Sequence, residues 1–161
     1  MISRLFYLPD GAGYVLFDEL VLTHMYGYAQ TRWLDREAGG QLFSHSPHDS
    51  AVIITHATGP HRSDVRRRHA FIPDPRRATA DRHSHFAEGR HAVGLWHTHP
   101  EANPTPSEQD RITAMDYLDA FEGAMKGFLL VILGNQGCPL HLALWLARAD
   151  HRSTWRKLAE A

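Results

Sequence analysis

Four residues in one short segment have the types and the spacing of a metal site. His97 and His99 are separated by a single residue, and Ser107 and Asp110 follow at a spacing of three positions. Imidazole nitrogens and a carboxylate are frequent zinc ligands, and three protein ligands leave a fourth coordination position for water. Zinc lowers the pKa of such a water towards ~7, so the ligand set indicates hydrolysis. The pattern predicts one zinc ion per chain, bound by His97, His99 and Asp110.

The predicted elements around the motif bring its residues together. The apolar run 92–96 predicts a buried strand, and alternate side chains of an extended chain face the same way, so His97 and His99 project together. Three prolines within residues 100–106 exclude regular structure there. An amphipathic helix is predicted from Ser107 to about Phe121, with the aspartate of the motif one turn in. A strand, a turn and a helix therefore converge on one point.

Each part of the motif also has a purely structural interpretation. Paired histidines on a strand are often surface or cross-strand residues. The S-x-x-D segment is a variant of the capping box, in which Ser107 accepts hydrogen bonds from N–H groups at the helix start. We expect this capping role whatever else Ser107 does. The combination of H-x-H-P and S-x-x-D at this distance favours the metal site.

The full pattern resembles the JAMM motif of the JAB/MPN-domain metalloproteases. That family also uses an upstream glutamate in an E-x-G-G-x-L-like segment, which stands here at 37–43 as Glu-Ala-Gly-Gly-Gln-Leu-Phe. The chain is most similar to bacterial stand-alone JAB peptidases, through an A-T-G-P segment at 57–60, F-I-P-D at 71–74 and W-H-T-H-P-E at 96–101. Several such proteins belong to operons with ubiquitin-activating-like and ubiquitin-conjugating-like enzymes, including type II CBASS antiphage operons. The match spans about residues 18–146.

The resemblance implies roles for individual residues. Glu37 is the expected general base, which takes a proton from water and returns it to the leaving amine. Ser107 is the expected donor to the oxyanion, an interaction worth up to ~3–4 kcal/mol. The substrate is expected to be an extended C-terminal tail of a ubiquitin-like or similarly conjugated protein. Such a tail would pair with a sheet edge in a groove beside the metal.

The segment 58–72 is the predicted wall of this groove. It carries Arg62, Arg66, Arg67 and Arg68, which could pair with carboxylates on a ubiquitin-like partner. A solvated basic loop is an equally good interpretation. Nucleic acid is not an expected partner, because no aromatic residues are interleaved with these arginines and the chain is not basic overall.

Composition restricts the class of protein. The chain has 161 residues, a formal net charge of −1 and 43% hydrophobic residues, as in a globular domain. Its longest strongly apolar run, 127–133, is far shorter than the ~20 residues that span a bilayer, so no membrane association is expected. The one cysteine excludes an internal disulfide. We expect a cytoplasmic protein.

The order of predicted elements indicates the α/β class, with one MPN/JAB-like domain over residues 1–161 and a curved mixed β-sheet flanked by helices. Residues 46–50 are predicted to form a hairpin loop, and 58–68 to be irregular. Helices are predicted at about 18–32, 75–89, 107–121 and 153–161, and strands at 41–44, 51–56, 70–72, 92–96, 127–133 and 140–147.

Three functional hypotheses follow. The first is a deubiquitinase-like zinc peptidase or isopeptidase that acts after the C-terminal tail of a ubiquitin-like or conjugated protein, in the CBASS setting a nucleotide-cyclising enzyme. The second is a processing peptidase for a sulfur-carrier protein in cofactor or cysteine biosynthesis. The third is a non-catalytic MPN scaffold, which is disfavoured because such scaffolds typically lack one or more of the motif residues, all of which are present here.

Overall fold

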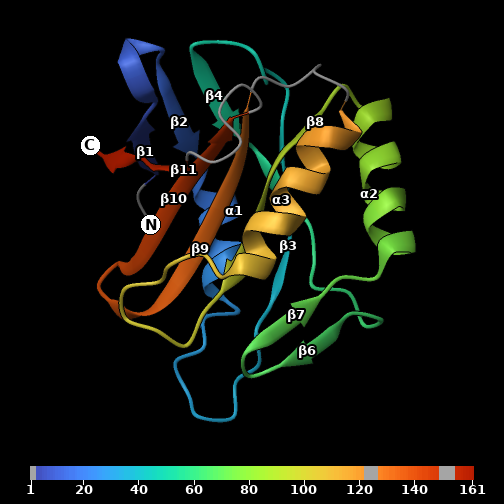
Figure 1. Cartoon of the computed structure of the whole chain (residues 1–161), viewed down its shortest axis with the longest axis vertical. Coiled ribbons are helices and arrows are strands. Elements are labelled where there is room, and N and C mark those ends of the chain that lie inside the picture. Colours follow the sequence, from blue (N-terminus) through green and yellow to red (C-terminus); the bar gives the residue numbers. More distant parts are fainter. Residues whose placement is uncertain (1–2, 122–126, 149–154) are drawn as a thin grey trace.

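A six-stranded mixed sheet forms the centre of the computed structural model, which describes residues 3–121, 127–148 and 155–161 (Figure 1). The strand order is β11-β10-β9-β8-β3-β5, with β8 and β9 parallel and the other neighbours antiparallel. Its strands are β3 (Gly39–Ser44), β5 (His56–Ala57), β8 (His91–Thr98), β9 (Gly127–Gly137), β10 (Leu140–Arg148) and β11 (Trp155–Lys157).

Among the described residues, three α-helices cover this sheet. They are α1 (Glu19–Tyr26), α2 (Pro75–Ala87) and α3 (Glu108–Ala120). Figure 1 shows α2 and α3 side by side in front of the sheet and α1 behind it. The helix α3 lies in the crossover between the parallel strands β8 and β9, a connection that parallel strands require. Within the described part of the chain, no helix is long and apolar enough to cross a membrane.

The core lies between the sheet and its helices. The strand β9 reads Gly-Phe-Leu-Leu-Val-Ile-Leu at its start and is buried from Phe128 to Gly134, as expected for a strand covered on both faces. Several large side chains are fully buried with it, namely Trp96, Phe6, Phe17, Phe43, Leu22, Met25, Leu42 and Ile54. This buried core supports the end of β8 and the start of β3. His97 lies at the end of β8, and Gly39 and Gly40 lie at the start of β3.

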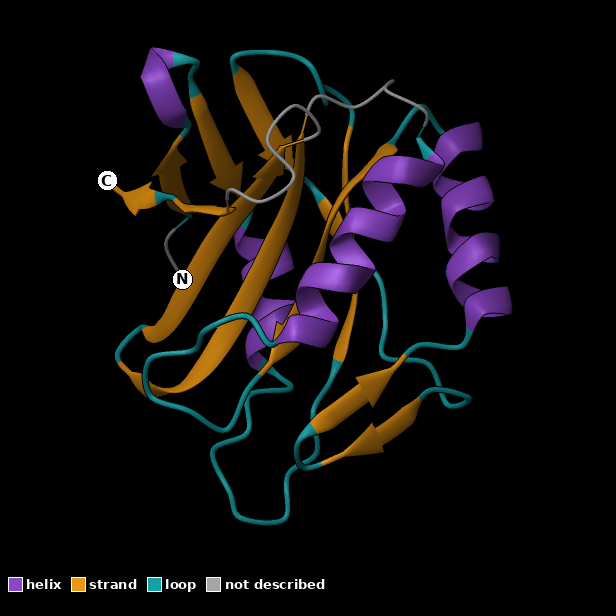
Figure 2. Cartoon of the chain, viewed as in Figure 1, coloured by secondary structure: helices purple, strands orange, loops and turns teal. Residues whose placement is uncertain are grey.

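Two smaller sheets complete the fold (Figure 2). The first has the order β12-β1-β2-β4, and the second is the hairpin β6-β7. A short 3-10 helix, Pro9–Gly11, joins the first two strands. The strands are β1 (Arg4–Tyr7), β2 (Tyr14–Phe17), β4 (Ala51–Ile54), β6 (Val65–Arg67), β7 (Ala70–Ile72) and β12 (Ala159–Glu160).

The predicted α/β class with a mixed sheet flanked by helices is confirmed, but the two smaller sheets were not predicted. Residues 51–56 were expected to form a single strand after a hairpin loop at 46–50. Instead β4 pairs in parallel with β2, and β5 pairs with β3, so the chain changes sheets at Thr55. The physical reason is the N-terminal hairpin β1-β2, which offers β4 a free edge and was not recognised in the sequence.

The region 58–68 is also more regular than predicted. Residues 65–67 form β6 and pair with β7, whose existence at 70–72 was predicted. Alternation of exposed and half-buried side chains in Val65, Arg66 and Arg67 marks β6 as a surface strand. Its basic composition concealed it, because arginine carries little strand preference of its own.

Two helix predictions require correction. The first helix ends at Tyr26 and not near Arg32, because Gln30 is buried in tertiary hydrogen bonds instead of continuing the helix. The C-terminal helix predicted over 153–161 was wrong: residues 155–157 form β11 against the edge of β10, and 159–160 form β12 against β1. Residues 153 and 154 lie outside the described part of the chain.

Candidate metal centre

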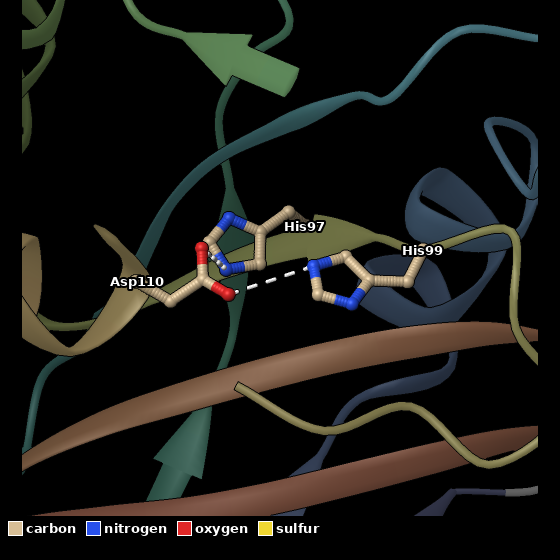
Figure 3. A group of neighbouring side chains, drawn as sticks. All are labelled: His97, His99 and Asp110. Carbon is tan, nitrogen blue, oxygen red and sulfur yellow. Dashed lines mark ion pairs between the residues drawn. The ribbon is translucent and has the colours of Figure 1, made fainter. Parts of the chain in front are cut away.

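Three side chains of the predicted motif converge at the end of β8. One ligand atom from each of His97, His99 and Asp110 can be chosen so that all lie within 4.8 Å of one another. His97 Nε2 lies 3.3 Å from Asp110 Oδ1, and His99 Nε2 lies 3.5 Å from Asp110 Oδ2 (Figure 3). Both histidines are buried, and Asp110 is half-buried. The predicted ligand set is thus assembled by the fold.

The strand geometry explains why the two imidazoles face the same point. His97 is paired with Ile132 of β9 and with Gly39 of β3, and the N–H of His99 donates to the Leu133 carbonyl at 2.9 Å. Both residues are therefore held in extended backbone with alternate side chains on one face. Their rings lie nearly parallel, with centroids 5.7 Å apart.

A capping box at the start of α3 fixes the carboxylate of Asp110. The Ser107 N–H donates to Asp110 Oδ2 at 2.7 Å, and the Asp110 N–H donates to Ser107 Oγ at 3.2 Å. The predicted capping role of Ser107 is confirmed. Because one carboxylate oxygen also faces each histidine, the reciprocal cap orients Asp110 towards the imidazoles as well as stabilising the helix.

The electrostatics of the three residues suit a bound cation. Burial lowers the pKa of His97, so its imidazole stays neutral, and its buried Nε2 has no hydrogen-bond partner among the described residues. Burial opposes ionisation of Asp110, yet hydrogen bonds from His99 and Ser107 and the nearby His97 hold its pKa well below the usual range. An orphaned imidazole nitrogen beside a carboxylate fits the donor set that zinc prefers.

Glu37 lies two residues before β3, next to this group. Continuing the antiparallel pairing of Gly39 with His97 by two residues places Glu37 opposite His99. Its side chain is only 8% exposed. Burial, and to a smaller degree the charges of Asp110 and Glu101, raise the pKa of Glu37 to about 7, although His99 acts in the opposite direction. Such a carboxyl can take up and release a proton near neutral pH.

A pocket of about 580 Å³, counting space open to solvent, adjoins the metal residues. It is bounded by β3, β8, α2, α3 and parts of the segment 58–74. Its wall includes His97, Asp110, Trp96 and Phe71. A side chain on Gly40 would meet the Thr58 carbonyl at 1.7 Å, so only glycine allows the strand to approach this segment. The predicted groove segment 58–72 therefore borders the site.

The four arginines of that segment lie in different surroundings. Arg66 donates through Nε to the Glu37 carbonyl at 2.7 Å, and Arg68 donates to the Trp33 carbonyl and stacks over the Trp33 ring. Arg62 and Arg67 are exposed. A role for any of them in substrate binding stays a prediction.

The sequence interpretation gave no role to Gln30 or Thr98. Both are buried beside Glu37, and they are hydrogen-bonded to each other at 3.1 Å although 68 positions separate them. Their one local signal is a threonine between the two motif histidines, after the apolar run 92–96. Glu101 was noted only as part of the W-H-T-H-P-E segment. Its carboxylate lies 4.0 Å from His99 Nδ1.

Comparison with known proteins identifies the family of this chain. Residues 21–156 match the family model described as prokaryotic homologs of the JAB domain. The chain belongs to this JAB-domain family. Glu37, His97, His99, Ser107 and Asp110 all fall within the matched region, and the resemblance drawn from the JAMM motif is confirmed.

Two curated relatives cover most of the JAB domain. A protein named CD-NTase/cGAS isopeptidase from Pseudomonas aeruginosa (strain BWHPSA011 / Pa011) is 35% identical over 130 residues, 78% of this chain and 80% of that protein. A protein of the same name from Escherichia coli (strain TW11681) is 28% identical over 109 residues, 66% of this chain and 69% of that protein. The solution structure of a Desulfitobacterium hafniense protein shares the fold, with a TM-score of 0.59, 16% identity, and coverage of 90% of this chain and 88% of that one.

Proposed function

We propose that this protein is a zinc-dependent isopeptidase that hydrolyses the bond after the C-terminal tail of a conjugated protein. The observation that carries the proposal is the convergence of His97, His99 and Asp110 beside the buried carboxyl of Glu37. The names of the two curated relatives support a CD-NTase or cGAS-like enzyme as the conjugated protein.

His97 Nε2, His99 Nε2 and the Asp110 carboxylate would hold the zinc ion. When bound, zinc supplies a Lewis acid and lowers the pKa of water. Glu37 would accept the proton of the attacking water and return it to the departing lysine amine. Burial raises the pKa of Glu37 in the metal-free chain, which favours uptake of this proton.

Ser107 would stabilise the negative charge that develops on the carbonyl oxygen. Its Oγ accepts the Asp110 N–H, and its hydroxyl, which also hydrogen-bonds the Asp110 carboxylate, would turn to the oxyanion as a donor. Ser107 is exposed at the start of α3, on the side of Asp110. A donor aimed at the oxyanion acts mainly in the transition state.

The pocket beside His97 would receive the tail, with Thr58, Gly59 and Phe71 of β7 in one wall. An extended tail can add main-chain hydrogen bonds to a strand edge, and the exposed Arg62 and Arg67 would meet carboxylates of the conjugated protein. A cytoplasmic location, operon-encoded ubiquitin-activating-like and conjugating-like enzymes and a part in antiphage defence belong to the same proposal.

The other two hypotheses have less support. A sulfur-carrier processing peptidase would use the same residues, but neither curated relative carries such a name. A non-catalytic scaffold would have no need of a complete ligand set with a carboxyl of raised pKa at its side.

Metal analysis and cleavage test the proposal together. We expect about one zinc per wild-type chain, loss of zinc in His97→Ala, and retained zinc without cleavage in Glu37→Gln. The substrate is a reporter lysine joined through an isopeptide bond to the C-terminal tail of a CD-NTase, compared with the same tail in a linear fusion. Cleavage by Glu37→Gln at the wild-type rate, or absence of zinc from the wild type, would overturn the proposal.

A further inference from the structure

The main chain around Glu37 is held at every peptide group by residues outside the metal site. The Glu37 N–H donates to the Arg67 carbonyl at 2.8 Å, and its own carbonyl accepts from Arg66 Nε at 2.7 Å. Arg66 also donates to the Arg36 carbonyl at 3.2 Å. The hairpin β6-β7 therefore holds one side of the segment that presents Glu37.

The other side of the segment is held by Thr98 and Gln30. The Ala38 N–H donates to Thr98 Oγ1 at 3.0 Å, and the Thr98 hydroxyl donates to Gln30 Oε1 at 3.1 Å. Gln30 Nε2 donates to the Arg68 carbonyl at 2.8 Å and to the Asp35 carbonyl at 3.3 Å. Thr98 is fully buried and Gln30 is 1% exposed, so water does not compete for these bonds.

This arrangement matters because Glu37 has no regular structure of its own. It lies two residues before β3, in a segment without helix or strand. Thr98 stands between the two histidines on β8, so strand alternation directs its side chain away from the metal residues. A hydroxyl there can bind the Ala38 amide without entering the site. One strand thus presents metal ligands on one face and secures the general base from the other.

We propose that Thr98, Gln30 and Arg66 are positioning residues for Glu37. They fix the backbone from residue 35 to residue 38, and through it the place of the carboxyl beside the metal ligands. Arg66 then acts on catalysis by holding Glu37, and it is not primarily a contact for the substrate. The kinetic part of this inference rests on the proposed isopeptidase activity.

Substitution of Thr98 tests one side of the segment. Thr98→Val keeps the shape and removes both hydrogen bonds, whereas Thr98→Ser keeps the hydroxyl. We expect Thr98→Val to retain zinc, with kcat reduced ~100-fold and KM nearly unchanged, since a displacement of ~1 Å can cost that much. Thr98→Ser should recover most of kcat. The control is Ser44→Ala, which removes another fully buried hydroxyl at the far end of β3 and should leave kcat unchanged.

Arg66→Ala tests the other side and stays informative if Thr98→Val does not fold. A positioning role predicts a loss of kcat at unchanged KM, whereas a substrate contact predicts a raised KM at unchanged kcat. The second result would overturn the assignment of Arg66. A kcat for Thr98→Val equal to that of Ser44→Ala would overturn the assignment of Thr98 and Gln30.

Hydrogen exchange of the Ala38 amide gives a readout that does not depend on activity. We expect exchange at least ~10-fold faster in Thr98→Val than in Ser44→Ala, with wild-type protection in Thr98→Ser. Unchanged protection in Thr98→Val would show that Thr98 does not hold this segment. The Ala38 amide could lose protection in Thr98→Val as expected while the wild type fails to cleave the substrate. In that case the proposed function would be wrong and the positioning role would stand.

Discussion

Glu37 combines burial with a position next to three other ionisable groups. Its carboxyl holds a proton more tightly in the folded chain than a solvated glutamate does, because burial disfavours the charged form. For the proposed catalysis this means that burial favours uptake of a proton by Glu37. For stability it means that a charge at this position is unfavourable when no cation is bound.

The metal-free protein should therefore become less stable as pH rises through the range in which Glu37 ionises. The pKa of Glu37 is about 7 in the folded chain against 4.5 for an ordinary glutamate, so unfolding releases a proton between these values. The free energy of unfolding should fall by ~1–2 kcal/mol from pH 4.5 to 7, after allowance for solvent screening, and then level off. In Glu37→Gln the free energy of unfolding should not show this ~1–2 kcal/mol decrease.

Urea unfolding with a chelator present, at several pH values, measures the effect. The result is the difference in unfolding free energy between wild type and Glu37→Gln at each pH. Most other titrating groups are common to both chains, so their contributions cancel. Equal pH dependence in the two proteins would mean that the Glu37 carboxyl is not buried as described.

The motif residues differed in how far the sequence alone could place them. His97, His99 and Asp110 were predictable because strand alternation and one helical turn are local rules. Glu37 reaches the site through pairing of distant strands, so only the family resemblance identified it. Thr98 and Gln30 could not be assigned, since no local pattern reveals a hydrogen bond between residues 68 positions apart.

At the scale of elements, the start of α3 serves the helix and the site together. Ser107 caps the helix, faces Asp110, and is the proposed donor to the oxyanion. These roles can be separated by substitution, because an aspartate can cap a helix but its carboxylate cannot donate a hydrogen bond.

Ser107→Ala should lower stability by ~1 kcal/mol and reduce cleavage, while Ser107→Asp should recover the stability without the activity. Thermal unfolding, zinc content and kcat measured on both variants check this. Full activity in Ser107→Asp would leave Ser107 with a capping role only.

Elements with a strong pattern of their own were predicted, and those that depend on a partner strand were not. The helices α2 and α3 carry their own start signals, Asp74-Pro75 and Ser107. In contrast, β11 and β12 have only three and two residues and exist because β10 and β1 offer free edges. A residue-level helix preference cannot anticipate such pairing.

At the scale of the whole molecule, the C-terminal strands close the core far from the metal residues in sequence. Leu158 is 6% exposed, belongs to the main hydrophobic cluster, and its N–H donates to the Leu144 carbonyl at 2.8 Å. Leu158→Ala should cost ~2–4 kcal/mol of unfolding free energy, with zinc content and kcat per folded molecule unchanged. Its exposed neighbour provides the control: Lys157→Ala should change stability by less than ~0.5 kcal/mol. Loss of zinc in Leu158→Ala at temperatures where it stays folded would contradict this separation.

The crossover that places α3 between two parallel strands has a thermodynamic consequence. His97 and His99 belong to the end of a strand and Asp110 to the helix that follows, so their donor atoms meet only when β8, α3 and β9 are packed. The proposed zinc ion would then bind the native chain far better than the unfolded one, and folding stability would depend on the free zinc concentration. At free zinc 100 times the dissociation constant, the native state would gain ~2.7 kcal/mol. A cell that withdraws zinc would thus weaken the fold of this protein as well as the proposed activity.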